Sequence, residues 1–100
     1  MAFRNMVASN VSSQRAFNTT YTNNTLHPMM LKILCYHSEV EGNYSELVVD
    51  GVPIDRSGGH VTSGTLYYRY TLSGIVPPGS TYRVNSQFTK EVWIEYVPRT

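Results

Sequence analysis

The sequence predicts an all-β protein: a single small antiparallel β-sandwich, jelly-roll-like or closed as a small barrel, with six to seven strands. Short β-prone runs recur along the chain, separated by turn residues at intervals of roughly ten residues, which is typical of sandwiches and barrels. No long stretch shows the apolar period of a helix. The length of 100 residues fits one domain.

The N-terminal segment, residues 1–14, is polar and rich in small side chains. A short helix from Asn5 to Ser13 is one interpretation, but Ser, Asn and Val are weak helix formers, which favours an extended or flexible arm. We therefore expect an N-terminal arm over residues 1–14 and a β-sandwich domain over residues 15–100. From Phe17 onward β-branched and aromatic residues indicate the first strand, which Asn23-Asn24 ends.

Pro28 precedes a strand with two distinct faces. Leu31, Ile33 and Cys35 alternate on one face and are all apolar, so this face should point into the core. Lys32 lies on the other face, which should be partly wet. The loop that follows, from Glu39 to Ser45, contains Gly42-Asn43.

Asp50-Gly51, between two β-branched residues, is the strongest local signal. It predicts a type I′ hairpin turn, whose twist matches the strands that it joins. Pro53 cannot donate to a ladder, so the returning strand should be short or lie at a sheet edge.

A second sharp turn is predicted at Pro77-Pro78-Gly79. The two prolines remove two backbone donors, and Gly79 accepts the positive φ of a type II turn. It should separate the β-prone run of residues 65–76 from a strand at residues 81–85.

The last run, residues 92–97, offers two faces to the core. One face carries Val92, Ile94 and Tyr96, and the other carries Trp93, Glu95 and Val97. We expect the face that carries Ile94 to point into the core. The predicted core is therefore Leu31, Ile33, Leu66, Val84 and Ile94, with Trp93 at least partly buried nearby.

Composition argues against several classes of partner. The net charge is +1 and the eight basic residues are scattered, so no nucleic-acid surface is indicated. No apolar stretch approaches the roughly 18 residues that span a bilayer, so no membrane partner is expected. The N-terminus lacks a secretory apolar region, which indicates synthesis in a cytoplasm. Cys35 is the only cysteine, and its apolar surroundings favour a buried, inert thiol.

Patterns that would carry catalysis are weak. His37-Ser38-Glu39 puts two possible ligands on one strand face, but a metal site needs more ligands brought by folding. No Gly-x-Ser-x-Gly elbow marks a nucleophile, and Gly58-Gly59 lacks the helix and lysine of a phosphate loop. We expect no enzyme activity and assign no catalytic, cofactor-binding or metal-binding residue, and no cofactor.

Contact with a partner is the function class that composition favours. Tyrosines at 67, 68 and 70 cannot all face one way; they are either contact residues or ordinary β-formers, and both readings remain open. The candidate contact residues lie in or beside the two loops at 39–46 and 56–63: Glu41, Asn43, Tyr44, Arg56, His60 and Tyr67.

Several short motifs follow one another along the chain in an order that resembles that of a known domain. They are Arg15, Thr20 to Thr25, Pro28 with its strand, Val49-Asp50-Gly51-Val52, Ile75 to Tyr82, and Trp93-Ile94-Glu95. Together they span about residues 15 to 96 and resemble a small β domain found in tail and tail-fibre proteins of tailed bacteriophages. The resemblance implies a structural virion protein without catalytic residues.

The expected function is that of a tail-tip or tail-fibre component, acting in assembly, host-surface contact or both. A capsid decoration or head-fibre protein is the alternative, and a small glycan hydrolase is a third, less favoured, reading. Expected partners are further copies of this chain, with a trimer favoured, other phage virion proteins, and a host surface glycan or protein. The expected location is the virion, with the tail favoured, after synthesis in the host bacterial cytoplasm.

Overall fold

A computed structural model describes residues 6–38, 43–59, 67–86 and 89–98. Eight strands and one short 3-10 turn make up the described chain. In order they are β1 Met6–Asn10, the 3-10 turn η1 Ser12–Gln14, β2 Tyr21–Thr22, β3 Met29–Ser38, β4 Asn43–Val49, β5 Val52–Gly59, β6 Tyr67–Val76, β7 Thr81–Asn85 and β8 Thr89–Pro98. No helix in this described part of the chain has the length and apolar character to cross a membrane.

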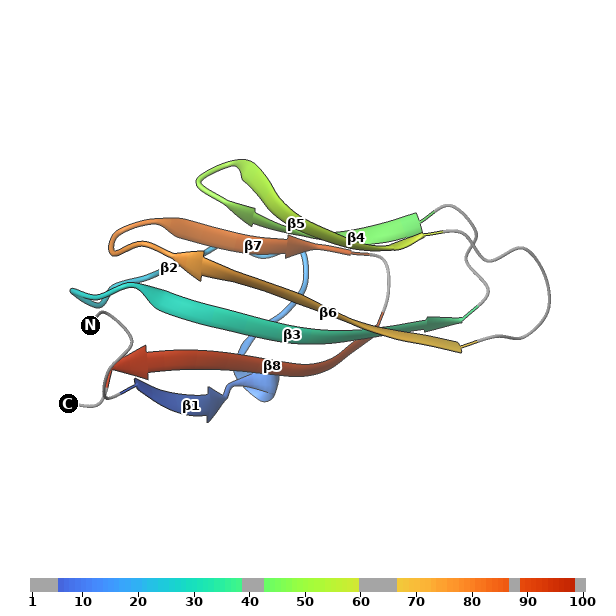
Figure 1. Ribbon diagram of the computed structural model, residues 1–100, viewed down its shortest axis with the longest axis horizontal. Coiled ribbons are helices and arrows are strands. Elements are labelled where there is room, and N and C mark those ends of the chain that lie inside the picture. The colour runs from blue at the N-terminus through green and yellow to red at the C-terminus, as the bar shows by residue number, and fades with distance from the viewer. Residues whose placement is uncertain (1–5, 39–42, 60–66, 87–88, 99–100) are drawn as a thin grey trace.

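The strands form two four-stranded antiparallel sheets packed face to face, as Figure 1 shows. One sheet has the order β1-β8-β3-β6 and the other the order β2-β7-β4-β5. This order is that of the eight-stranded jelly roll, in which successive strands lie in opposite sheets except for the hairpin β4–β5. The predicted all-β sandwich is confirmed, with eight strands in place of six to seven.

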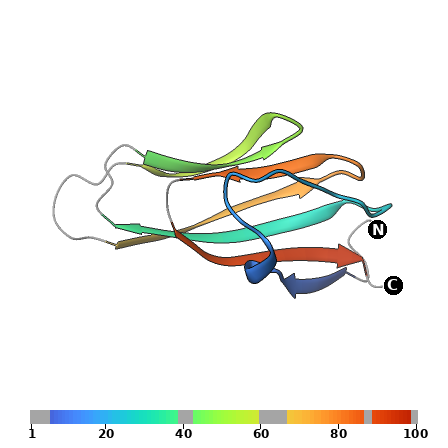
Figure 2. The same ribbon diagram turned by 180° about the vertical axis from the view of Figure 1, so that it is seen from behind.

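The additional strand, β1, lies inside the segment that the sequence predicts as an N-terminal arm, residues 1–14. β1 pairs along its whole length with β8, from Met6 opposite Pro98 to Asn10 opposite Ile94, and Val11 is buried. Residues 6–10 do not form a helix that would pair their backbone N–H and C=O groups. The ladder with β8 supplies hydrogen-bond partners for these groups instead. Figure 2 shows the segment between β1 and β2 passing from one sheet to the other.

The core lies between the sheets and follows the alternation of the strands. Leu31, Ile33, Val84 and Trp93 are fully buried, as predicted, together with Cys35. Leu66 lies outside the described residues. The prediction that Ile94 of β8 lies in the core is wrong, because Ile94 is only half-buried.

Both predicted turns are confirmed by their backbone angles. Asp50 and Gly51 have φ of 51° and 80°, the double positive φ of a type I′ turn. Gly79 has φ of 80°, and the amide of Ser80 donates to the carbonyl of Pro77 across 3.1 Å, as in a type II turn. β5 is an edge strand, as Pro53 predicts.

The domain is elongated, about 47 × 23 × 23 Å. One end carries the two confirmed turns together with the start of β1 and the end of β8. At the other end β3 finishes, β4 begins, β5 finishes and β6 begins (Figure 1).

Candidate functional site

A buried polar cluster is centred on Glu95 of β8. Glu95 is 3% exposed and Trp93 is fully buried, whereas Ile94 and Tyr96 are half-buried. The inner face of β8 is therefore the one that carries Trp93, Glu95 and Val97. The prediction of Ile94 as a core residue is wrong: alternation gives two faces but does not say which turns inward, and a carboxylate can be buried where partners bind it.

Arg15 is the main partner of Glu95 and comes from the segment that follows η1. Its Nε donates to Glu95 Oε2 across 2.8 Å and its Nη2 donates to Oε1 across 3.0 Å. This bidentate geometry makes strong, directional contacts, and both groups are largely removed from water. The hydrogen bonds that Arg15 donates to Glu95 raise the pKa of Arg15 above its ordinary value, so the guanidinium remains charged.

Two neutral donors complete the shell of the carboxylate. The hydroxyl of Tyr82 on β7 donates to Glu95 Oε2 across 2.9 Å, and the indole nitrogen of Trp93 donates to the same oxygen across 3.2 Å. Burial, reinforced by the nearby negative charge of Glu95, raises the pKa of Tyr82 to about 12. The phenol is therefore a neutral donor at any physiological pH.

Aromatic rings enclose this pair on the side of the second sheet. The guanidinium carbon of Arg15 lies 4.8 Å from the ring centre of Tyr21, a cation–π distance. The Tyr21 ring meets Trp93 edge to face at 6.0 Å, and Phe17 lies 6.4 Å from the same indole. These rings exclude water and strengthen the electrostatic contacts inside.

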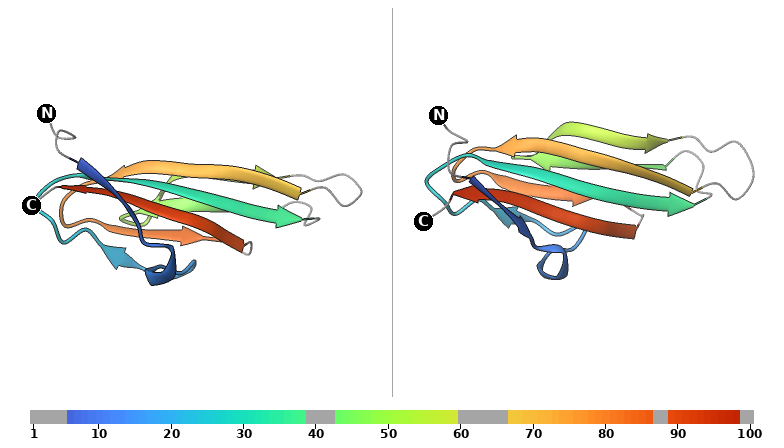
Figure 3. Two further views of the ribbon diagram at one scale, coloured as in Figure 1. Left: turned by 90° about the horizontal axis from the view of Figure 1, so that it is seen from below. Right: turned by 60° about the horizontal axis from the view of Figure 1, so that its bottom comes forward.

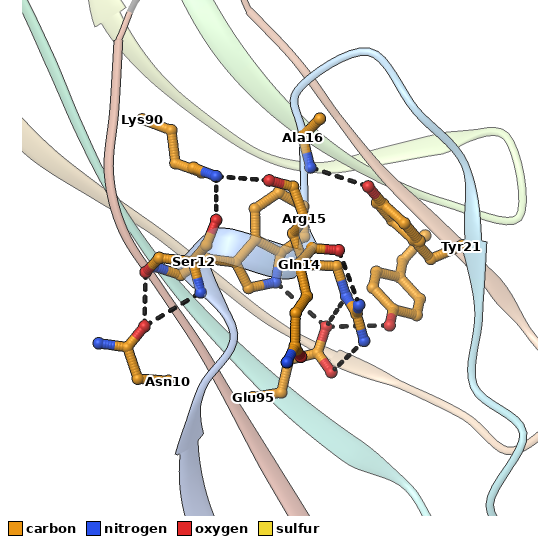
Figure 4. Close-up of polar contacts among 10 residues, drawn as sticks. Asn10, Ser12, Gln14, Arg15, Ala16, Tyr21, Lys90 and Glu95 are labelled. Atoms are coloured by element: carbon orange, nitrogen blue, oxygen red, sulfur yellow. Dashed lines mark hydrogen bonds and ion pairs between the residues drawn. The ribbon is translucent and has the colours of Figure 1, made fainter.

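A second layer of contacts fastens the η1 segment to β8, as Figure 4 shows. The Lys90 ammonium donates to the carbonyls of Ser12 and Arg15. The amide of Trp93 donates to the Ser12 hydroxyl across 2.9 Å, and Asn10 Oδ1 accepts from the amide and hydroxyl of Ser12. These hydrogen bonds hold residues 10–15 against β8.

The chemistry open to this cluster is limited by its own saturation. Glu95 Oε2 accepts three hydrogen bonds and Oε1 accepts one. These four contacts engage both oxygens of the Glu95 carboxylate within the fold, so the carboxylate is bound as a structural group and is not presented to a substrate. We therefore assign the cluster to the integrity of the sandwich.

A second cluster of hydrogen bonds joins three turns at the end of the sandwich where β1 begins and β8 ends. The Asn23 side chain is buried; its amide donates to the carbonyls of His27 and Val76 across 2.9 and 3.0 Å, and its main chain pairs with Gly79 and Ser80. Asp50 Oδ2 accepts from the Ser80 hydroxyl across 2.6 Å, which lowers the pKa of Asp50. The two glycine turns predicted separately thus support each other.

The candidate contact residues that the structure describes lie toward the opposite end of the sandwich. Asn43 and Tyr44 begin β4 and Tyr67 begins β6, so the fold brings these three positions to one end. Arg56 lies on β5 and binds Glu46 across 2.6 Å with a side chain that is 56% exposed. Glu41 and His60 lie outside the described residues.

Other places for chemistry are sparse in the described chain. Among its residues, no three His, Cys, Asp or Glu side chains gather as a metal ion requires. Glu39 of the His37-Ser38-Glu39 sequence falls outside the described residues. An open hollow of about 500 Å³ lies beside β5, lined by Pro53, Ile54, Asp55 and Arg56.

Sequence reasoning missed the Glu95 cluster as a site, although one signal was present. Glu95 shares a strand face with Trp93, and a carboxylate on the same face as a buried indole needs partners. Arg15, 80 residues away, could be paired with it only by the fold.

Strand order and buried cluster together define this protein as a jelly-roll domain with its N-terminal segment ion-paired to its last strand. No protein-family model matches the chain, and no curated protein matches it.

Proposed function

We propose that this protein is a structural component of the virion of a tailed bacteriophage, at the tail tip or in a tail fibre. There it acts in assembly, in contact with the host surface, or in both. It works as a homo-oligomer, for which the symmetry of a tail favours three copies.

One observation carries the proposal: residues that define the resemblance, far apart in sequence, meet in the fold. Arg15, Trp93 and Glu95 share one buried cluster. The Asp50-Gly51 and Pro78-Gly79 turns are bonded through Asp50 and Ser80. These contacts support the reading of the resembling residues as parts of one structural unit.

The fold supplies weaker support, as an analogy. Jelly rolls recur in viral structural proteins and in lectins, but one fold hosts many functions. For this chain the analogy supports both assembly and surface contact.

The division of the molecule into two ends fits a contact function. Asn23 and Asp50 join the turns at the end that carries the chain termini, whereas the described positions Asn43, Tyr44 and Tyr67 lie at the opposite end. A rigid scaffold that presents loops at one end is a common arrangement for recognition.

Location in the particle tests the proposal directly. Purified virions would be labelled with an antibody against the chain and viewed by negative-stain microscopy, with pre-immune antibody as the control. Label at the tail tip or along fibres is expected. Label on the head would replace the tail role with capsid decoration, and particles free of label and of the chain by mass spectrometry would overturn the proposal.

A further inference from the structure

On one side of the sandwich the edge strands of the two sheets meet. β6 is the last strand of the sheet β1-β8-β3-β6, β5 is the last strand of the other sheet, and the two strands are in contact. The right panel of Figure 3 shows β5 running along β6 on this side. An edge strand presents backbone N–H and C=O groups to which a strand of another chain can pair, so an open edge favours unwanted association.

A β-bulge in β5 turns an acidic side chain toward the inner face of this edge strand. Leu47 of β4 pairs with Asp55, and the next residue of β4, Val48, pairs with Pro53. Ile54 is therefore the extra residue of the bulge, a device that re-aims the side chains beside it. Residues directly opposite each other on two antiparallel strands point to the same face. Because Leu47 is fully buried between the sheets, Asp55 also faces inward, where it is half-buried.

The inward carboxylate binds the backbone edge of the opposite sheet. Asp55 Oδ2 accepts a hydrogen bond from the amide of Ser73 on β6 across 2.8 Å, and Oδ1 accepts from the amide of Arg56 across 2.9 Å. Along an antiparallel strand, successive amides turn alternately to one neighbour and to the other. The Ser73 amide is therefore turned away from β3 and is a donor of the β6 edge. Asp55 occupies this donor with a charged acceptor, which makes the stronger kind of hydrogen bond.

The next residue of β6, Gly74, allows β5 to approach this closely. A Cβ on Gly74 would lie 2.4 Å from Ile54 Cδ1 and 3.1 Å from Leu47 Cδ2. Gly74 is not among the glycines with a positive φ, so the space it leaves, rather than its backbone angle, accounts for a glycine here. The bulged Ile54 therefore packs directly on the backbone of β6, beside the amide that Asp55 binds.

Pro53, the residue before the bulge, adds a third feature of the same kind. It is exposed on β5 and has no N–H to offer to a further strand. A proline, a bulge and an inward-pointing charge are each devices by which natural sheets prevent edge-to-edge pairing. In β5 all three lie on consecutive residues, at the place where the strand contacts the edge of the other sheet.

We propose that Asp55 is an edge-capping residue, which binds the Ser73 amide and closes the β5–β6 side of the sandwich against strands of other chains. The bulge at Ile54 aims the carboxylate, and Gly74 lets the two edges meet. Copies of the chain are thereby prevented from pairing edge to edge through β6. This inference goes beyond the proposed function and holds for the chain whatever its location in a particle.

Amide hydrogen exchange, followed by NMR, tests the cap itself. The variants are Asp55→Ala and Asp55→Asn, and Glu46→Ala is the matched control, since it removes the same charge from the neighbouring strand and breaks an exposed ion pair. The readout is the exchange rate of the Ser73 amide relative to that of Leu72, whose amide turns toward β3. In Asp55→Ala this ratio should rise about ten-fold or more, because the edge donor loses its acceptor. Asp55→Asn keeps a neutral acceptor and should give a smaller rise, and Glu46→Ala should give none.

Sedimentation velocity of the same proteins tests the consequence for association. The series runs from low to several hundred micromolar, and circular dichroism of each variant verifies the fold. Asp55→Ala should form species larger than those of the unchanged protein, in a proportion that grows with concentration. Glu46→Ala carries the same net charge as Asp55→Ala and should sediment as the unchanged protein does.

Each result bears on one step of the inference. An unchanged exchange ratio in folded Asp55→Ala overturns the cap, and if that variant does not fold, an unchanged ratio in Asp55→Asn does so. A raised ratio without further association overturns the protection against edge pairing. Equal association of Glu46→Ala and Asp55→Ala would assign the effect to net charge and overturn it as well. The virion location is judged independently by the antibody label.

Discussion

Arg15 and Glu95, separated by 80 residues, form a bidentate ion pair of 2.8 and 3.0 Å inside the sandwich. The pair joins the segment after β1 to β8, the first strand's partner. Its carboxylate also binds Tyr82 of the opposite sheet, so one anion connects both layers and the N-terminal segment.

Loss of this charge should destabilise the fold strongly. In Glu95→Gln the guanidinium keeps only a neutral acceptor in a largely buried place. We expect a loss of about 2–4 kcal/mol in the free energy of unfolding, measured by urea denaturation. Glu46→Gln, which removes the partner of exposed Arg56, is the matched control and should cost less than about 1 kcal/mol. Equal losses in the two variants would contradict the assigned role of Glu95.

Ionisation of Tyr82 should limit stability at high pH. The ordinary pKa of 10 applies in the unfolded chain, whereas burial raises the pKa of Tyr82 to about 12 in the folded one. The contribution is complete below pH 10 and is lost as pH rises from 10 to 12, because only the unfolded chain releases the proton there. It amounts to up to about 2–3 kcal/mol.

Tyr82→Phe separates this effect from other alkaline titrations. The variant should be less stable near pH 8, because Glu95 loses a donor, and its stability should fall less steeply between pH 10 and 12. Urea unfolding at several pH values gives the comparison. Identical slopes in the two proteins would refute the shift.

Gly79 is required for its backbone angle alone. A Cβ at this position would meet nothing within 4 Å, and φ is +80°. Gly79→Val should therefore cost about 1 kcal/mol or more, whereas Gly79→Asn, which tolerates positive φ, should cost less. Thermal midpoints of both variants measure this, and an unchanged midpoint for Gly79→Val would show that the angle is not needed.

Ile33 and Ile94 should respond differently to truncation. Ile33 is fully buried, so Ile33→Ala leaves a cavity and should cost roughly 2–4 kcal/mol. Ile94 lies half-buried on the outer face, and Ile94→Ala should cost less than about 1 kcal/mol. Denaturation at concentrations too low for association makes the comparison fair. A larger cost at Ile94 would reverse the assignment of the two faces of β8.

Cys35 should resist modification in the folded protein. Its side chain is fully buried, and burial raises the pKa of the thiol to about 11. Reaction with a thiol reagent at pH 8 should be at least about a hundred-fold slower than in denaturant, because it waits for opening of the structure. A native rate near the denatured rate would mean that β3 opens readily.

The local features of this protein follow from short stretches of its sequence. Asp50-Gly51 and Pro78-Gly79 predicted their turns because glycine and proline act through their own backbone angles, independently of distant residues. Alternation placed Leu31 and Ile33 inside for the same reason, since strand faces follow from a period of two.

Features that depend on residues distant in the sequence could be assigned from the three-dimensional fold but not from local patterns. Residues 6–10 have no strong preference for helix or strand. They form a strand because their backbone groups pair with those of β8. The face of β8 that turns inward could not be read from Ile94 and Glu95, because the cost of burying a carboxylate depends on its partners. Arg15 and Tyr82 offset that cost, and the fold brings them to Glu95 from 80 and 13 residues away along the chain.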